Sequence, residues 1–428
     1  MKKRSHRALD QEDPLCCCEY VNRQGERSHM AACCCDCEDL DEACDRWMKR
    51  EEQKTDSVSR VLATINDRLR VPWISGARPV DLSLIPPLIL LPVFLHIASW
   101  HYLLGIIVLT TLPVTVLWYY YVTHRKKGRT LFFLSLAILS LFYMFYLFVT
   151  EVFSRGDVNH FQLGAVTTGV ALTVIFLINT KRGPGYARPR PADTHSTVTY
   201  HSPPADVDGA YLNGARHQVV IANRVSSLHQ SGESGTAQES VEHREVQRTN
   251  WCDVCKLVRP PRAGHCRICG VCILRLDHHC VWINSCVGQA NHSSFLLMLF
   301  FFLLTSLYGI SLVLGSVCPQ QNVMIALFYC PNVYDQYSTA LCFTCAWYSS
   351  IVTGGLLHLL VLQLINVSYN TTEREARLAM REKTGRKLLW GLIVDTGAYS
   401  RGFWNNWTEF LTMSKTLEAS TSKPTHLV

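Results

Sequence analysis

Hydrophobic residues are gathered into six long runs separated by polar segments, and these runs predict membrane-spanning helices. Each run holds about 17–25 mostly apolar residues, the length that a hydrocarbon core of about 30 Å requires. Soluble core helices are the alternative, but six such runs in one chain argue against it. Prolines interrupt the first run, and membrane helices tolerate them where neighbours satisfy the freed backbone groups. The predicted spans are 82–98, 102–122, 131–150, 161–179, 295–316 and 339–365.

The basic residues between these runs predict how the chain is oriented in the membrane. Lys and Arg are dense in the turn 124–129, at Lys181-Arg182 and in the tail beyond Glu373. They are absent from 99–101 and 317–338, and 151–160 has only Arg155. Because basic loops stay on the cytosolic side, we expect both termini and the long segment after the fourth span to be cytosolic.

The fold class that follows is an all-α polytopic membrane protein with six transmembrane helices. A small cytosolic cysteine-rich domain lies between spans four and five. Residues 183–249 are rich in Pro, Gly, Ser, Thr, Gln and His, a composition that cannot bury enough apolar surface to fold. The predicted segments are a cytosolic N-terminal region (1–81), transmembrane helices one to four (82–180), a disordered linker (181–249), the cysteine-rich domain (250–294), transmembrane helices five and six (295–366) and a cytosolic C-terminal region (367–428).

The 19 cysteines change this picture, because they fall into groups of different kinds. A small secreted disulfide scaffold is excluded by the length of the chain and by its charged start, which has no cleavable signal peptide. In a cytosolic loop, pairs of cysteines with two residues between them indicate zinc ligands rather than disulfides. The net charge of +7 is modest and does not call for nucleic acid. The ten candidate ligands are Cys252, Cys255, His265, Cys266, Cys269, Cys272, His278, His279, Cys280 and Cys286.

Counting these ligands points to a nucleophile. Two closed structural zinc sites take four ligands each, which leaves one histidine and one neighbouring cysteine. A spare imidazole beside a spare thiol is typical of an activated nucleophile, and Asp277 could orient the imidazole. The spacing does not decide whether His278 or His279 is spare. His292 is an eleventh candidate, expected at the membrane boundary because it leads into the fifth span.

Residues 252–295 resemble the cysteine-rich domain of the DHHC family of protein S-acyltransferases, whose name matches Asp277–Cys280. The similarity continues through Trp282, Asn284, Cys286, Gly288, Asn291 and Phe295, and the extra pair of N-terminal spans resembles the six-span members. The resemblance implies two interleaved structural zinc ions. One ion takes Cys252, Cys255, His265 and Cys272, and the other takes Cys266, Cys269, His279 and Cys286. His278 and Cys280 then remain free, with Asp277, as the catalytic residues.

The same resemblance implies a palmitoyltransferase with a ping-pong mechanism. Cys280 would take a fatty acyl group from acyl-CoA and pass it to membrane-proximal cysteines of protein substrates, with His278 as base and Asp277 orienting it. Golgi or endoplasmic reticulum membranes are the expected location, with the plasma membrane as the alternative. Five basic residues could meet CoA phosphates, or be solvated charges: Lys256, Arg259, Arg262, Arg267 and Arg275.

The C-terminal region departs from the family pattern at one point. Members carry Thr-Thr-x-Glu after the last span, whereas this chain reads Thr371-Thr372-Glu373-Arg374-Glu375, so Glu373 is not assigned the family role. A helix N-cap explains the threonines about as well. Asn406 matches a structural asparagine of the family. The last residue is of the type that a PDZ groove accepts, but without Ser or Thr at the third-last place an ordinary tail is the alternative.

The remaining cysteines leave their roles open. Clusters at 16–18 and 33–37 suit acylation better than metal binding, and no defined role is a third reading. Cys318 and Cys330 could form a lumenal disulfide, and Cys342 and Cys345 are expected to be small apolar residues of the last span.

Three other functions fit less well. A membrane-anchored zinc module explains eight ligands but not the spare pair, and a nucleic-acid zinc finger needs a different spacing and a basic surface. A metal transporter would place ionisable residues in its spans, where His96 and His358 are the only obvious ones.

Overall fold

The structure is a computed structural model that describes residues 19–21, 27–29, 45–50, 67–72, 76–125, 130–188, 250–383, 386–388, 393–395 and 397–421. They form two compact units. The first unit draws on Met1–Ala171, Val281–Asn284 and Phe302–Gly355, and the second on Leu172–Cys280, Ser285–Phe301 and Leu356–Val428. The predicted N-terminal cysteine clusters, most of the predicted linker and the last seven residues lie outside the described part of the chain.

Five helices in the described residues are long and apolar enough to cross a membrane, and they make the chain an integral membrane protein. Each covers one of the predicted spans, with ends that differ by a few residues. Helix α5 (Phe132–Leu147) is extended by a π-helical turn η3 (Phe148–Val152) and a 3-10 turn η4 (Phe153–Arg155). The five are α4 (Tyr102–Arg125), α5 (Phe132–Leu147), α6 (His160–Arg182), α8 (His292–Val317) and α10 (Tyr337–Ser368).

The first predicted span differs from the other five. A 3-10 turn η2 (Leu82–Leu84) leads into α3 (Ile85–Ala98), an apolar helix of 14 residues. At 1.5 Å per residue α3 is about 21 Å long, shorter than the hydrocarbon core. Proline is favoured in the first turn of a helix because its missing N–H has no partner there, and Pro86 and Pro87 stand at the start of α3.

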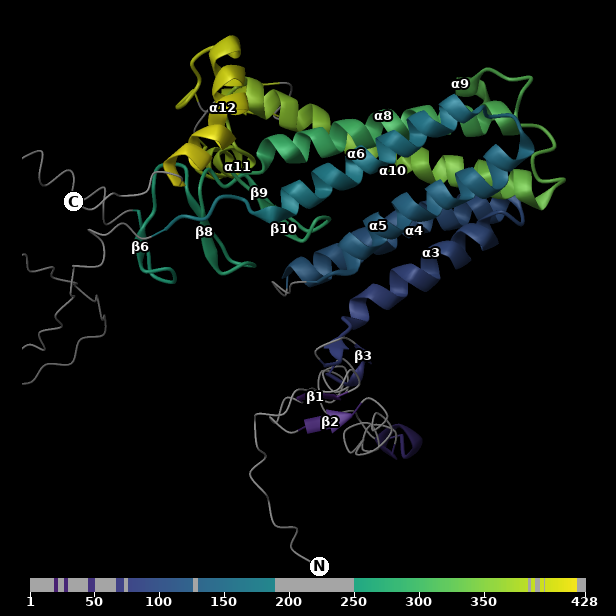
Figure 1. Cartoon of the computed structure of the whole chain (residues 1–428), viewed down its shortest axis with the longest axis horizontal. Helices are drawn as coiled ribbons and strands as arrows, with labels where there is room; N and C mark the ends of the chain where they lie inside the picture. Colours follow the sequence, from purple (N-terminus) through teal and green to yellow (C-terminus); the bar gives the residue numbers. More distant parts are fainter. Residues whose placement is uncertain are drawn as a thin grey trace, which may run out of the picture. The chain divides into compact units, whose positions relative to one another are not determined.

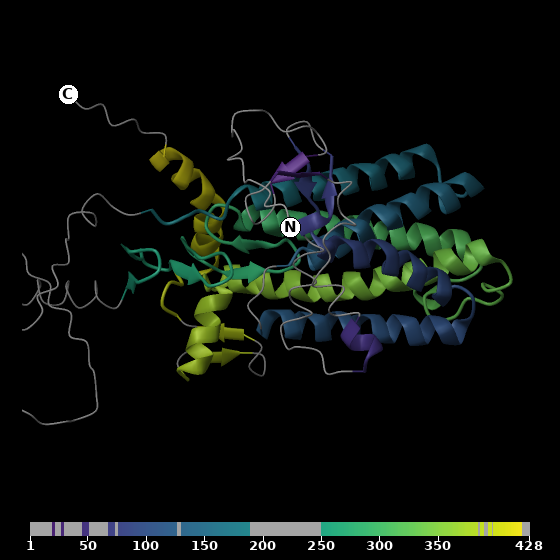
Figure 2. The ribbon, with the colours of Figure 1, turned by 90° about the horizontal axis from the view of Figure 1, so that it is seen from below.

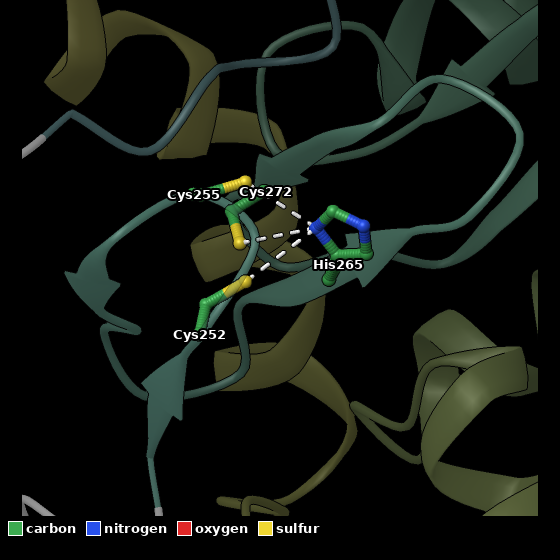
Figure 3. Close-up of side chains that lie close together, drawn as sticks. All are labelled: Cys252, Cys255, His265 and Cys272. Carbon is green, nitrogen blue, oxygen red and sulfur yellow. Dashed lines mark hydrogen bonds between the residues drawn. The ribbon is translucent and has the colours of Figure 1, made fainter.

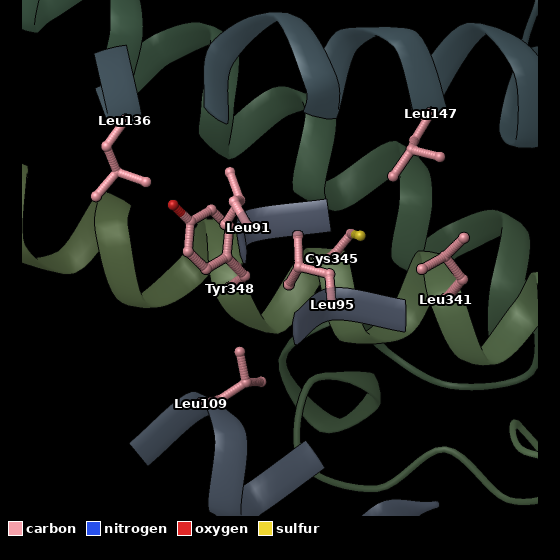
Figure 4. Close-up of a cluster of buried hydrophobic side chains, with 8 residues drawn as sticks. All are labelled: Leu91, Leu95, Leu109, Leu136, Leu147, Leu341, Cys345 and Tyr348. Atoms are coloured by element: carbon pink, nitrogen blue, oxygen red, sulfur yellow. The ribbon is translucent and has the colours of Figure 1, made fainter. Parts of the chain in front are cut away.

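The core of the first unit is built from leucines on several helices. Helix α3 packs against both α4 and α5 (Figure 1), and Figure 2 shows these helices from a second direction. Buried side chains from α3, α4, α5 and α10 meet in one cluster (Figure 4). Its members are Leu91, Leu95, Leu109, Leu136, Leu147, Leu341, Cys345 and Tyr348.

Four cysteines of this first unit belong to the part of the chain that the structure describes. Cys318 and Cys330 form a disulfide, with their Cα atoms 5.9 Å apart, around the short helix α9 (Val323–Ala326). Cys342 and Cys345 are buried in apolar clusters of α10, which confirms their reading as small core residues. The unit also contains two short hairpins, β1 (Glu19–Val21) with β2 (Arg27–His29) and β3 (Arg70–Val71) with β4 (Arg78–Pro79).

The second unit contains the cysteine-rich segment, folded as three two-stranded antiparallel hairpins. They pair β5 (Trp251–Cys252) with β6 (Leu257–Val258), β7 (Gly264–Cys266) with β8 (Val271–Ile273), and β9 (His278–Cys280) with β10 (Ser285–Val287). The unit also holds α11 (Glu373–Arg381), the hairpin of β11 (Arg386–Leu388) and β12 (Ile393–Asp395), and α12 (Phe403–Thr421).

Helix α11 begins at a capping box. The Thr372 hydroxyl accepts from the Glu375 N–H, and the Glu375 carboxylate accepts from the Thr372 N–H. Two donors that would otherwise lack partners are thereby satisfied, so the cap reading of Thr372 is confirmed.

Candidate functional site

The first group of chemistry-bearing side chains joins the hairpins β5–β6 and β7–β8. The sulfurs of Cys252, Cys255 and Cys272 lie 3.6, 3.3 and 3.8 Å from Nδ1 of His265, and Figure 3 shows the three thiols converging on the imidazole. A tetrahedral zinc with ordinary Zn–S and Zn–N bonds gives S···N edges of about 3.6 Å. The four residues therefore fit one metal ion.

The second group has the same composition and nearly the same dimensions. Nδ1 of His279 lies 3.7 Å from the Cys266 sulfur and 3.4 Å from those of Cys269 and Cys286. The backbone N–H of Cys269 donates to Cys266 Sγ over 3.4 Å, and Gly270 follows with φ at +70°, a conformation that glycine adopts without strain. This group could hold a second metal ion.

The register of the hairpins explains why the two groups interleave. Opposite partners supply ligands to the same group, His265 facing Cys272 and His279 facing Cys286. Successive side chains of a strand point to opposite faces, so Cys266 belongs to the second group although it follows His265. On β9 the same alternation puts His278 and Cys280 on one face and His279 on the other.

Asp277 and His278 form a buried pair outside both groups. Nδ1 of His278 lies 2.7 Å from Oδ2 of Asp277, and Asp277 is only 1% exposed. Burial would lower the pKa of His278, but its hydrogen bonds to Asp277 and Cys280 raise that pKa to about 10. Burial would raise the pKa of Asp277, but the hydrogen bond and charge of His278 hold it well below its usual range. With Nδ1 bound to Asp277, Nε2 is the nitrogen left for Cys280.

Two residues that the sequence left unassigned complete this arrangement. The backbone N–H of Glu373 donates to Asp277 Oδ1 over 2.8 Å, and its carboxylate lies 3.3 Å from His278 Nδ1. Gln363 Nε2 donates to Asp277 Oδ2 over 3.1 Å. A lone amide in an apolar span is the signal that could have singled out Gln363, since polar groups at membrane depth are costly and tend to be functional.

The five basic residues that could meet CoA phosphates differ in their surroundings. Arg262 forms a forked ion pair with Glu375, Nε to Oε1 and Nη2 to Oε2 at 2.8 Å each, and donates to Asn370. Arg275 is buried and donates to Asn370 Oδ1 over 2.8 Å. Both arginines therefore make internal contacts, and Arg259 donates to the Asn250 carbonyl. Lys256 and Arg267 are exposed.

Asn406 is also held internally. It is 1% exposed, accepts from the Arg401 N–H over 2.8 Å and donates to the Ser368 carbonyl over 2.8 Å. These contacts join the start of α12 to the end of α10, as a structural asparagine would.

The sequence profile of the DHHC palmitoyltransferase family matches residues 245–379. Palmitoyltransferase ZDHHC23-B of Danio rerio is 73% identical over 428 residues, which cover 100% of this chain and 99% of that protein. Palmitoyltransferase ZDHHC23 of Mus musculus is 50% identical, over 94% of each chain. The Homo sapiens protein of the same name is 52% identical, over 90% of this chain and 94% of its own. A chain with this profile match and this coverage belongs to the DHHC palmitoyltransferase family and is a protein S-palmitoyltransferase.

Proposed function

We propose that Cys280 is the nucleophile of a ping-pong palmitoyl transfer from acyl-CoA to cysteines of other proteins. The observation that carries this is the Asp277–His278 hydrogen bond of 2.7 Å, which lies outside both four-residue groups and shares its strand face with Cys280. The eight residues of the two four-residue groups and the residues that fit nucleophilic catalysis are thus separate sets.

In the first half-reaction His278 Nε2 takes the proton of the Cys280 thiol. The thiolate attacks the thioester carbonyl of acyl-CoA, the bond between the carbonyl carbon and the CoA sulfur breaks, and CoA leaves with the proton from His278. Asp277 keeps Nδ1–H of the imidazole oriented throughout. In the second half-reaction a substrate cysteine gives its proton to His278 and attacks the carbonyl carbon of acyl-Cys280. The bond between that carbon and Cys280 Sγ breaks, and His278 returns the proton to regenerate the Cys280 thiol.

We propose that the two four-residue groups hold structural zinc. Each group offers three thiols and one imidazole, which fill a tetrahedral ion and leave no open position for water. Bound zinc would fix the three hairpins relative to one another, and the hairpin β9–β10 in turn carries His278 and Cys280. The metal contributes to folding and takes no part in proton transfer.

The acyl chain needs an apolar environment, and the first unit has one. A cavity between its helices is lined mostly by apolar side chains such as Phe302, Ile310 and Val313. Burial of a chain stabilises it by about 0.8 kcal/mol per methylene. The apolar lining of this cavity suits an acyl chain.

The proposed topology has six spans, with α3 as the first, and places both termini and the cysteine-rich domain in the cytosol. The basic turn 124–129 and Lys181-Arg182 support this orientation. The disulfide of Cys318 and Cys330 agrees with a lumenal position of the loop between α8 and α10. Golgi or endoplasmic reticulum membranes are the proposed site, and membrane-proximal cysteines the proposed substrates.

The test is a Cys280→Ser variant of the full chain in which the eight cysteines before residue 45 are also serine, so that they cannot carry label. The variant should keep two zinc ions per chain but acquire no label from a clickable fatty acyl-CoA, while the parent with Cys280 labels. Transfer to a substrate at the normal rate by the serine variant would overturn the proposal.

A further inference from the structure

Behind Asp277 lies a chain of buried polar side chains that the mechanism above does not use. Gln363 Nε2 donates to Asp277 Oδ2 over 3.1 Å, and Gln363 Oε1 lies 2.9 Å from Nε2 of His292. Asp277 and Gln363 are each 1% exposed, and His292 is 2% exposed. The three residues come from different parts of the second unit: Asp277 from the loop just before β9, Gln363 from helix α10 and His292 from the first turn of α8.

The donors and acceptors that each group offers fix the direction of every hydrogen bond between these three side chains. The Asp277 carboxylate is an acceptor only, so the Gln363 amide must present its NH₂ to Asp277 and its oxygen to His292. His292 must then donate from Nε2–H. In the neutral imidazole Nδ1 is therefore an unprotonated nitrogen, and it has no hydrogen-bond partner among the described residues. An imidazolium would leave a buried N–H unsatisfied, so the geometry favours the neutral tautomer.

The surrounding rings hold both histidines in place. The ring of Phe410 meets His292 edge to face at 5.1 Å, and the ring of Phe295 meets His278 at 5.7 Å. With the ring of His292 fixed by packing, the Gln363 amide cannot rotate without losing one hydrogen bond at each end. Because Oδ2 of Asp277 also accepts from His278, a fixed amide holds the carboxylate that orients the catalytic imidazole.

We propose that His292 and Gln363 are positioning residues of the transfer reaction, which aim the Asp277 carboxylate at His278 through this hydrogen-bonded chain. The inference rests on the proposed function of Cys280. Neither residue touches the reacting atoms. Their removal should therefore slow the acylation of Cys280 without changing how tightly acyl-CoA binds. Hydrogen-bond partners that orient metal-binding histidines typically change metal affinity or activity by about 10- to 100-fold, and we expect an effect of similar size on the oriented His278.

The experiment compares three replacements at one position. His292→Phe keeps the ring packing against Phe410 but removes the donor. His292→Gln places an amide NH₂ close to where Nε2 stands, whereas His292→Asn places it near Nδ1 and does not reach Gln363. Initial rates of CoA release by the full chain in nanodiscs give kcat and KM for palmitoyl-CoA, and metal analysis gives the zinc content.

The proposal expects the Phe and Asn variants to lose about 10- to 100-fold in kcat, with KM and two zinc ions per chain unchanged. The Gln variant should recover to within about threefold of the parent. Gln363→Leu, which removes both hydrogen bonds at similar volume, should match His292→Phe, and the double variant should be no slower than either. His358→Phe, at an exposed histidine of the same helix α10, should leave kcat unchanged.

Two outcomes would overturn the proposal. His292→Phe at the parental rate would show that the donor is dispensable. Equal losses in the Phe and Gln variants, accompanied by lost zinc, would show that His292 is needed only for folding. Cys280→Ser separates these results from the proposed function, because a serine variant that still transfers acyl groups would reject the nucleophile itself. An inactive serine variant beside a fully active His292→Phe would reject the positioning chain alone.

Discussion

The same substitution at two adjacent histidines should separate the loss of catalysis from the loss of zinc. His278→Asn removes the proton acceptor, but its side-chain amide can still donate to Asp277 from a position close to Nδ1. Loss of a general base typically costs about 10²- to 10⁴-fold in rate, which corresponds to about 3–5 kcal/mol of transition-state stabilisation at 1.36 kcal/mol per factor of ten. The buried Asp277 carboxylate keeps a hydrogen-bond donor but loses the charge of His278, so the cost to folding should be well below that of losing a zinc ion.

His279→Asn removes the one nitrogen on which three thiols converge within 3.4–3.7 Å. A structural zinc site contributes roughly 10–16 kcal/mol to folding, comparable to the entire stability of an ordinary domain, about 5–15 kcal/mol. The variant should therefore lose one zinc ion and unfold the hairpins around it, and its loss of activity should follow from that.

The assay is the rate of acyl-enzyme labelling by a clickable palmitoyl-CoA, measured beside the zinc content and the thermal midpoint of each purified variant. The expected result is two zinc ions and slow labelling for His278→Asn, and one zinc ion or an aggregated protein for His279→Asn. The reasoning would be refuted if His278→Asn lost zinc as His279→Asn does. Labelling of His278→Asn at the parental rate would refute it equally.

Three further predictions concern folding and topology. Burial alone would raise the pKa of Glu375, but the forked ion pair with Arg262 outweighs it and lowers that pKa below its ordinary value. The ionised Glu375 therefore stabilises the fold above a pH of about 4.3. This stabilisation is lost as the pH falls through the pKa that Glu375 has in the folded state. The thermal midpoint of Glu375→Gln should lie below that of the parent at pH 7, and the gap should narrow in acid; a constant gap would contradict this. Cys269→Ser should lose one of two zinc ions by metal analysis, and an active protein with both ions would exclude the ligand assignment. The glycosylation sequons are at Asn291, Asn366, Asn370 and Asn406. Each lies in a segment expected to be cytosolic or at its membrane boundary, so endoglycosidase should not shift the electrophoretic mobility of the expressed protein. A shift would overturn the proposed orientation.

The sequence by itself determined the elements whose signals are local. Apolar runs of sufficient length specified the five long helices, because a membrane segment must satisfy its backbone internally and the helix does so within the run. Helix α3, which is shorter than these five, lies in the apolar run that three prolines interrupt. Cysteine pairs separated by two residues likewise marked turns that could hold a metal ion, since a few residues of backbone bring the two thiols of each pair together.

The sequence also offered ten candidate ligands, two more than two four-ligand sites need, but its spacing did not decide between His278 and His279. The decision lies in the pairing of β9 with β10, where His279 faces Cys286 and the alternation of the strand turns His278 to the other face. The family resemblance implied the same division. The register of the hairpin supplies its physical reason.

Only the tertiary structure revealed what surrounds Asp277. Gln363 and Glu373 stand 86 and 96 positions further along the chain, and no local pattern connects a glutamine in an apolar span with an aspartate in a cysteine-rich segment. Arg262 and Arg275, which as sequence fitted phosphate ligands equally well, pair instead with Glu375 and Asn370. A buried charge must find its partners within the fold, and where those partners come from distant segments, the packing of those segments decides which groups meet.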